Sequence, residues 1–86
     1  MPTISAFFGI LIRMFYNDHS PGHFHAEYSG ERASFDFDGN RIEGEMRSRT
    51  ARLLVRQWAE LHREELEDDW RRAREGSPLN YIEPLQ

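Results

Sequence analysis

Three of the four histidines of this chain fall within seven residues, at His19, His23 and His25. One residue separates the last two, so on a β-strand both imidazoles face the same side, about 7 Å apart at the backbone. His19 precedes them in the turn-rich segment N-D-H-S-P-G and can fold back over that side. Because imidazoles titrate near neutral pH, such a cluster is suited to general acid and base catalysis of phosphodiester chemistry.

A carboxylate beside the rings would fix their orientation and tautomer. The register of the strands indicates which carboxylate this is. With a two-residue turn at Ser29–Gly30, His23 lies opposite Asp36, and with a second at Gly39–Asn40, Asp36 lies opposite Glu43. Asp36 is therefore the predicted catalytic partner of the three histidines, in a site without a cofactor. One alternative is a divalent metal site made by His23, His25 and Glu43. Another is that the histidines are exposed strand residues with no role.

The second cluster is an island of arginine in an acidic chain. The net charge is −4, which argues against a general nucleic-acid coat protein, yet residues 47–63 contain five arginines and a single acid. Arginine can donate two parallel hydrogen bonds to one oxyanion. Cations at a helix N-terminus are unfavourable because the helix dipole is already positive there, and residues that break such a local rule are often functional. The predicted phosphate-binding residues are Arg47, Arg49, Arg52 and Arg56. The alternative is a solvated helix face paired with Glu43 and Glu45.

The elements that must position these residues follow from hydrophobic periodicity. Apolar and polar residues alternate in short runs within about residues 3–45, which predicts strands. Apolar residues then recur at spacings of three and four, which predicts a helix over about residues 48–75 with Ser48 as its N-cap and Gly76 as its stop. That helix is long for so small a domain, so a break near residues 63–65 that gives two helices is the expected alternative.

The predicted fold class is therefore α+β, as a single domain over residues 1–86. An antiparallel sheet of three to five strands packs on one long or kinked helix, and Trp58 and Trp70 lie on the apolar face of that helix. His62 shares this face and is predicted to be a buried structural residue. The short apolar tail over residues 78–86 is expected to dock or to add an edge strand.

Composition limits the classes of protein further. The mean hydropathy of −0.77 and the short apolar runs exclude a membrane span, and the absence of cysteine excludes disulfides and thiolate chemistry. The N-terminus lacks the pattern of a signal peptide, so a cytoplasmic location is expected. Phe7, Leu11 and Phe15 are predicted to lie on the sheet face away from the helix, as a partner or homodimer surface. The alternative is that the C-terminal tail covers them.

Three separated motifs carry a family resemblance. They are M-P-T-I-S-x-F-F-G-I-x-I-R-M, D-H-x-P-x-H-F-H-A-E-Y and W-A-E-L-H-R-E-E-L-x-x-x-W. With them the chain resembles, nearly end to end, the bacterial domain of unknown function 4160 (DUF4160) family. His19, His23 and His25 match the histidine motif of that family, whereas Gly22 stands where the family usually has a second proline. The resemblance implies a gene beside another small gene, in a family with suspected toxins of toxin–antitoxin modules.

Two functional hypotheses result. The first is a toxin-like component of a bacterial toxin–antitoxin module, with a metal-independent, endoribonuclease-like activity on RNA through the histidine cluster and a small cognate protein as its partner. The second is a non-catalytic protein-binding or regulatory module, on the antitoxin side, or a small metal-binding domain. The arginine island favours the first hypothesis, and the net negative charge and the apolar patch favour the second.

Overall fold

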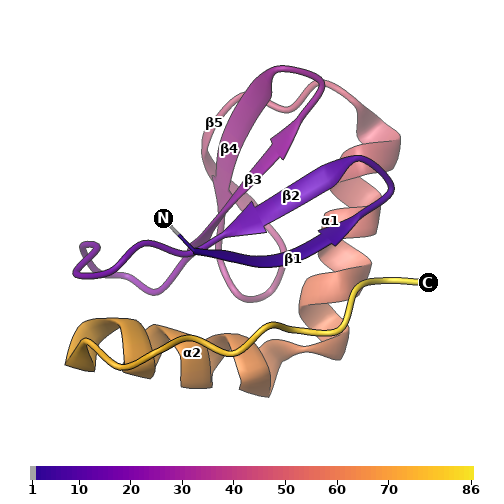
Figure 1. Ribbon diagram of the computed structural model, residues 1–86. Coiled ribbons are helices and arrows are strands. Elements are labelled where there is room, and N and C mark those ends of the chain that lie inside the picture. The colour runs from indigo at the N-terminus through magenta and orange to yellow at the C-terminus, as the bar shows by residue number, and fades with distance from the viewer. Residues whose placement is uncertain (1) are drawn as a thin grey trace.

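The computed structural model describes residues 2–86. Its sheet has five strands in chain order, each antiparallel to the next: β1 (Thr3–Phe7), β2 (Ile10–Arg13), β3 (Phe24–Tyr28), β4 (Glu31–Phe35) and β5 (Arg41–Gly44). Two helices follow, α1 (Arg49–Leu61) and α2 (Arg63–Glu75). In Figure 1, α1 lies behind the sheet and α2 runs beneath it, and the C-terminal tail returns along α2. The predicted α+β class is confirmed.

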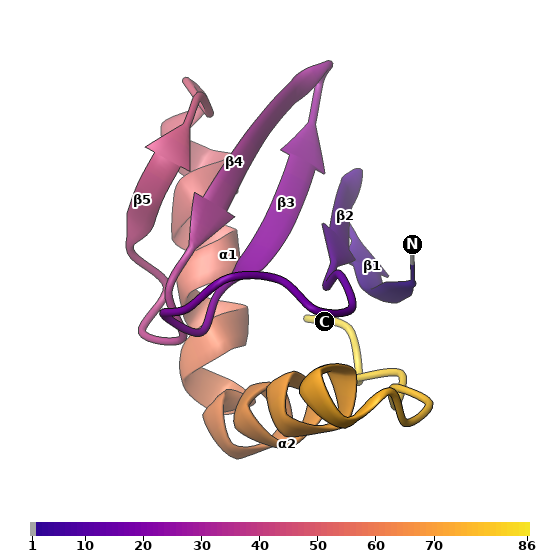
Figure 2. The same ribbon diagram turned by 90° about the vertical axis from the view of Figure 1, so that its left-hand side faces the viewer.

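The helical half is broken at His62, which confirms the two-helix alternative. The hydroxyl of Ser48 accepts a hydrogen bond from the Ala51 amide at 3.1 Å, so Ser48 is the N-cap of α1. Gly76 ends α2 in the left-handed conformation, with φ of 76°. Viewed from the side, α1 covers one face of the sheet and α2 turns away below it (Figure 2). Neither helix in residues 2–86 has the length and apolar character needed to cross a bilayer.

The core lies between the sheet and the helices, with Trp58 at its centre. This side chain is fully buried, and its ring centroid lies 5.5 Å from those of both Phe7 and Phe24. His62 is only half-buried; it packs on Trp58 at 5.8 Å and its Nδ1 lies 2.5 Å from a carboxylate oxygen of Glu65. It is therefore hydrogen-bonded and packed on the core but less buried than predicted, because the break after α1 places it at the helical corner.

The predicted register is confirmed for one hairpin and wrong for the next. Across β3 and β4, His25 lies opposite Ser34, as predicted from the tight turn between these strands. Across β4 and β5, however, Ser34 rather than Asp36 lies opposite Glu43. The chain already turns at Asp36, whose carbonyl accepts from the Gly39 amide at 3.0 Å, so the predicted two-residue turn does not form. An irregularity after Ser34 completes the shift in pairing.

The N-terminal hairpin corrects the predicted apolar patch. Phe7 pairs with Ile10 and faces the core, where only 6% of it is exposed, because the hairpin turns at Phe8 and Gly9. Leu11 remains at the surface, and Phe15 is half-buried. The predicted surface of three side chains is thus reduced to two.

The C-terminal tail docks against the outer strand of this hairpin. The Ile82 amide donates to the Ile4 carbonyl of β1 at 2.7 Å, and the indole N–H of Trp58 donates to the Glu83 carbonyl at 3.0 Å. Ile82 is buried in the core. The tail therefore adds no strand but helps to fix the sheet against α1.

Candidate functional site

The loop between β2 and β3 brings one carboxylate and two imidazoles together. Oδ2 of Asp18 lies 2.9 Å from Nε2 of His23 and 3.0 Å from Nε2 of His25. His25 projects from β3, and His23 immediately precedes that strand. His19, in the same loop, is largely exposed; its Nε2 lies 3.8 Å from Oδ1 of Asp18, and its ring lies 5.0 Å from that of His23. The three atoms Oδ2, Nε2 and Nε2 therefore converge on one point.

Each member of this cluster is oriented by a contact behind it. Nδ1 of His23 lies 2.7 Å from the Pro21 carbonyl oxygen, and Nδ1 of His25 lies 3.2 Å from the Ser34 hydroxyl. The backbone N–H of His19 donates to Oδ1 of Asp18 at 2.9 Å, which leaves Oδ2 for the two rings. The cluster is thus held by strand β4 and by its own loop.

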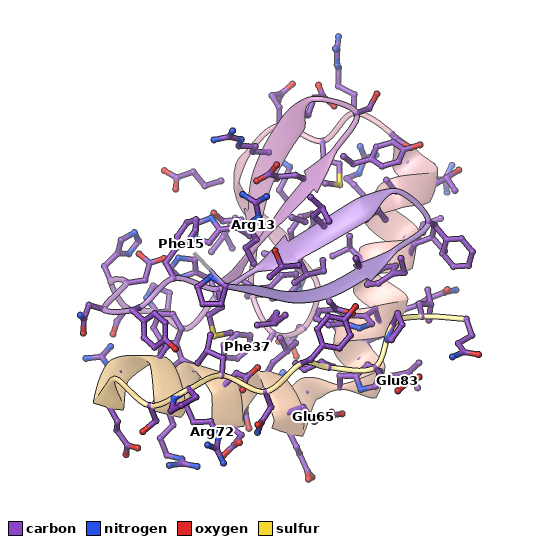
Figure 3. The ribbon with its side chains drawn as sticks, in the orientation of Figure 1. Arg13, Phe15, Phe37, Glu65, Arg72 and Glu83 are labelled. Atoms are coloured by element: carbon purple, nitrogen blue, oxygen red, sulfur yellow. The ribbon has the colours of Figure 1, made fainter. Side chains whose placement is uncertain are left out.

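Aromatic side chains and α2 hold the loop against the fold. The ring of His23 packs on Trp70 of α2 at 5.3 Å, and the ring of His25 packs on Phe15 at 4.3 Å. Figure 3 shows Phe15 beside the loop and Phe37 in the layer between the sheet and α2. A side chain at Gly22 would meet the Phe37 ring at 2.7 Å, so glycine permits this close packing of loop and turn. These contacts leave His23 only 2% exposed.

The electrostatics of the cluster favour an ionised Asp18. Burial raises the pKa of this carboxyl, but the hydrogen bonds from His25 and from the His19 amide, together with the charges of His23 and His25, outweigh burial and hold the pKa below its ordinary value. Asp18 is therefore a carboxylate at neutral pH, and both of its oxygens accept hydrogen bonds.

His23 then lies between two groups that can only accept. The Pro21 carbonyl requires a proton on Nδ1, so a neutral His23 presents the lone pair of Nε2 to the Asp18 carboxylate, 2.9 Å away. Nε2 of His23 and Oδ2 of Asp18 would then be two acceptors facing each other, so a positive charge must lie between them. That charge is either a second proton on the ring or a metal ion. His25 has no such conflict, because the Ser34 hydroxyl can donate to its Nδ1 and leave the proton on Nε2 for Asp18.

The structure places the predicted carboxylates elsewhere. Asp36 lies in the turn after β4, where its Oδ1 accepts from the backbone amides of Asp38 and Asn40. Glu43 lies opposite Ser34 and lines a shallow hollow with His25, but it is not one of the three convergent donors. Sequence reasoning missed Asp18. The spacing D-x-x-x-x-H-x-H was the available signal, because a carboxylate in a short loop before the strand can fold back onto its rings.

The predicted arginine site is also changed in membership. Arg49, Arg52 and Arg56 line a groove of about 300 Å³ together with Arg41 of β5. Arg47 lies outside the groove, since its Nε pairs with a Glu31 carboxylate oxygen at 2.7 Å. Pairing of the island with Glu43 and Glu45, the alternative interpretation, is not found within residues 2–86.

Comparison with known proteins identifies the family. The model of a family described as Domain of unknown function (DUF4160) matches residues 9–71, which is more than half of the chain. This span contains both the histidine loop and the arginine groove. No curated protein and no solved structure matches the chain.

Proposed function

The chain belongs to the family described as Domain of unknown function (DUF4160), and from the geometry of its histidine loop we propose that it is a divalent-metal-binding protein. The proposed ligands are Oδ2 of Asp18 and the Nε2 atoms of His23 and His25. These donor atoms all lie within 4.8 Å of one another. Two imidazoles and a carboxylate suit first-row divalent ions such as Zn²⁺.

The observation that carries this proposal is the pair of contacts behind the rings. Histidines that bind a metal through one nitrogen almost always engage the other with a carbonyl, a carboxylate or a similar partner. His23 has the Pro21 carbonyl in that place, and His25 has the Ser34 hydroxyl. A metal ion would also resolve the conflict at His23, because it replaces the second proton between the ring and Asp18. Three protein ligands leave positions for water, which the ion would activate.

Titration of the metal-stripped protein with Zn²⁺, followed by calorimetry and thermal melting, tests this proposal. We expect one ion per chain and a rise in Tm with Zn²⁺ concentration, since a ligand at 100 times its Kd stabilises the folded state by about 2.7 kcal/mol. Mg²⁺ prefers oxygen ligands and is expected to leave Tm unchanged. A flat titration and an unchanged Tm with Zn²⁺, Mn²⁺ and Ni²⁺ would exclude the metal site.

A second candidate function is metal-independent cleavage of RNA by a toxin-like chain that a small cognate protein neutralises. The partial exposure of the same cluster favours it. The side chains of His25 and Asp18 are 26% and 15% exposed, and that of His19 is 76% exposed beside them. A phosphodiester could therefore approach His25, with Asp18 orienting the ring as the imidazole transfers a proton.

Induction of the chain alone in a bacterial host tests the second candidate. We expect growth arrest with degraded total RNA for the wild type, normal growth for His25→Ala, and arrest for the matched variant His62→Ala, whose ring lies outside the cluster. Normal growth at equal abundance of folded wild-type protein would exclude a toxic activity. Arrest that persists in His25→Ala would remove the histidine from it, and purified protein that cleaves RNA only without chelator would assign the cleavage to a metal.

A further inference from the structure

The groove between α1 and the turn after β4 concentrates positive charge at one place on the molecule. Arg41, Arg49, Arg52 and Arg56 line it, and within residues 2–86 none of them has a carboxylate within 4.0 Å. By contrast, arginines elsewhere in this part of the chain, such as Arg63, Arg71 and Arg72, pair with acids. Arg74 is an exception, since it donates to the Ser20 hydroxyl and lies over the Trp70 ring. From this unneutralised cluster we propose that the groove binds the phosphate groups of single-stranded nucleic acid.

Neutral contacts hold the groove in shape without consuming its charge. One terminal nitrogen of Arg52 donates to the backbone carbonyls of Met46 and Arg47, at 2.5 and 2.9 Å, and one of Arg56 donates to the side-chain oxygen of Asn40 at 2.9 Å. The guanidinium of Arg49 makes no hydrogen bond to another residue in the described part of the chain. Each guanidinium has five N–H groups, so most of these donors remain free for an oxyanion.

The turn packs closely on α1 and forms the other wall of the groove. Gly39 has φ of +84°, and a Cβ there would lie 2.7 Å from the Cα of Arg56. Only glycine permits this approach, which places Asn40 against Arg56 and sets the width of the groove. The arrangement of the cations is therefore built into the fold and does not depend on flexible side chains alone.

The dimensions and lining favour a nucleic-acid strand over an isolated anion. Arg49, Arg52 and Arg56 follow one side of α1 over eight residues, which span about 10 Å and can reach more than one phosphate. Leu53 lies among them and is 47% exposed, and it offers an apolar surface to a base beside guanidinium planes that can stack. A concave groove of about 300 Å³ suits a strand with accessible bases better than the convex backbone of a duplex.

The groove and the histidine loop lie on either side of one turn. Phe37 of that turn meets Gly22 of the loop, while Gly39 and Asn40 line the groove. The inference goes beyond the metal site and rests on none of its ligands. It deepens the second candidate function by naming the surface that would hold RNA. The following experiment distinguishes a failure of RNA binding in the groove from a failure of the toxic activity.

Fluorescence anisotropy with labelled single-stranded poly(U) measures binding to the intact chain. We expect the double variant Arg49→Gln/Arg56→Gln to weaken binding at least tenfold and to lower the slope of log K against log salt by about 0.7 for each lost phosphate contact. The matched variant Arg32→Gln/Arg71→Gln removes the same charge elsewhere and is expected to bind as the wild type. Thermal melting confirms that each variant is folded.

Several results would overturn the inference. The first is that the wild type does not bind poly(U), and the second is that both double variants lose the same affinity for it. The third is that polyglutamate displaces poly(U) as effectively as unlabelled RNA does, which would assign the groove to an acidic peptide. Saturation by inorganic pyrophosphate with no affinity for poly(U) would restrict it to small phosphates. Binding of poly(U) by a chain that arrests no growth would uphold the groove and exclude the toxic activity.

Discussion

Asp18→Asn is expected to abolish metal binding while leaving the fold intact. The substitution removes the negative charge on which His23 and His25 converge, and an amide oxygen is a much poorer ligand than a carboxylate. Its oxygen can still accept from the His19 amide, so the loop keeps that contact. We expect the Kd for Zn²⁺ to rise by at least about 100-fold, since even changes to residues behind the ligands cost 10- to 100-fold. Calorimetry of the stripped variant gives this value directly.

The matched control is Asp36→Asn, which makes the same chemical change at the carboxylate predicted from the sequence. The asparagine oxygen can still accept the turn amides of Asp38 and Asn40, so this variant tests only the lost charge. It is expected to bind Zn²⁺ as the wild type does. Wild-type affinity in Asp18→Asn, or equal losses in both variants, would contradict the assignment of Asp18 as a ligand.

How far the sequence predicts this site depends on the length of chain between its parts. His25 and Ser34 were correctly paired because a two-residue turn joins their strands and leaves only one register that buries Phe24 and Phe35 together. The next turn is longer and is held by the Asp36 side chain, so local turn chemistry decided the register of β5. The pairing there is shifted by two residues, so Glu43 lies opposite Ser34, and Asp36 lies in the turn outside the strand.

Asp18 could not be ranked above these acids from sequence alone. It lies in a loop, where no periodicity says which way a side chain points. Its position depends on contacts from distant elements, including Trp70 against His23 and the hydrogen bond from Arg74 to Ser20. Such contacts appear only once α2 is placed beneath the loop.

The arginine island shows the same limit. Composition alone located the excess of positive charge, but it did not reveal that Arg47 pairs with Glu31, sixteen residues earlier in the chain. Nor did it reveal that Arg41 of β5 joins the groove. A run of arginines in the sequence predicts roughly where positive charge lies, but the packing of the sheet on α1 determines which arginines line the same groove.

Trp58→Ala is expected to give the largest loss of stability in the chain. Trp58 is fully buried, it packs on Phe7 and Phe24, and its indole N–H holds the tail through the Glu83 carbonyl. Removing such a side chain costs about 3–5 kcal/mol, which is a large part of the 5–15 kcal/mol that stabilises a typical domain. Urea denaturation followed by circular dichroism measures the change in the free energy of unfolding. A variant that shows no folded baseline even without urea would correspond to a loss at the upper end of this range.

Trp58→Phe separates the two contributions. Phenylalanine keeps an aromatic ring between Phe7 and Phe24 but cannot donate to the Glu83 carbonyl. We therefore expect a smaller loss of stability, made up of the lost hydrogen bond, worth about 0.5–1.5 kcal/mol, and of the packing lost with the second ring of the indole. Leu61→Ala, at a side chain that is 70% exposed, should cost less than about 0.5 kcal/mol. If Trp58→Ala cost no more than Leu61→Ala, the sheet and α1 would not share the core described above. Because α2 is fixed to the rest of the chain partly through the tail that Trp58 anchors, the metal affinity of Trp58→Phe also reports whether the core positions the histidine loop.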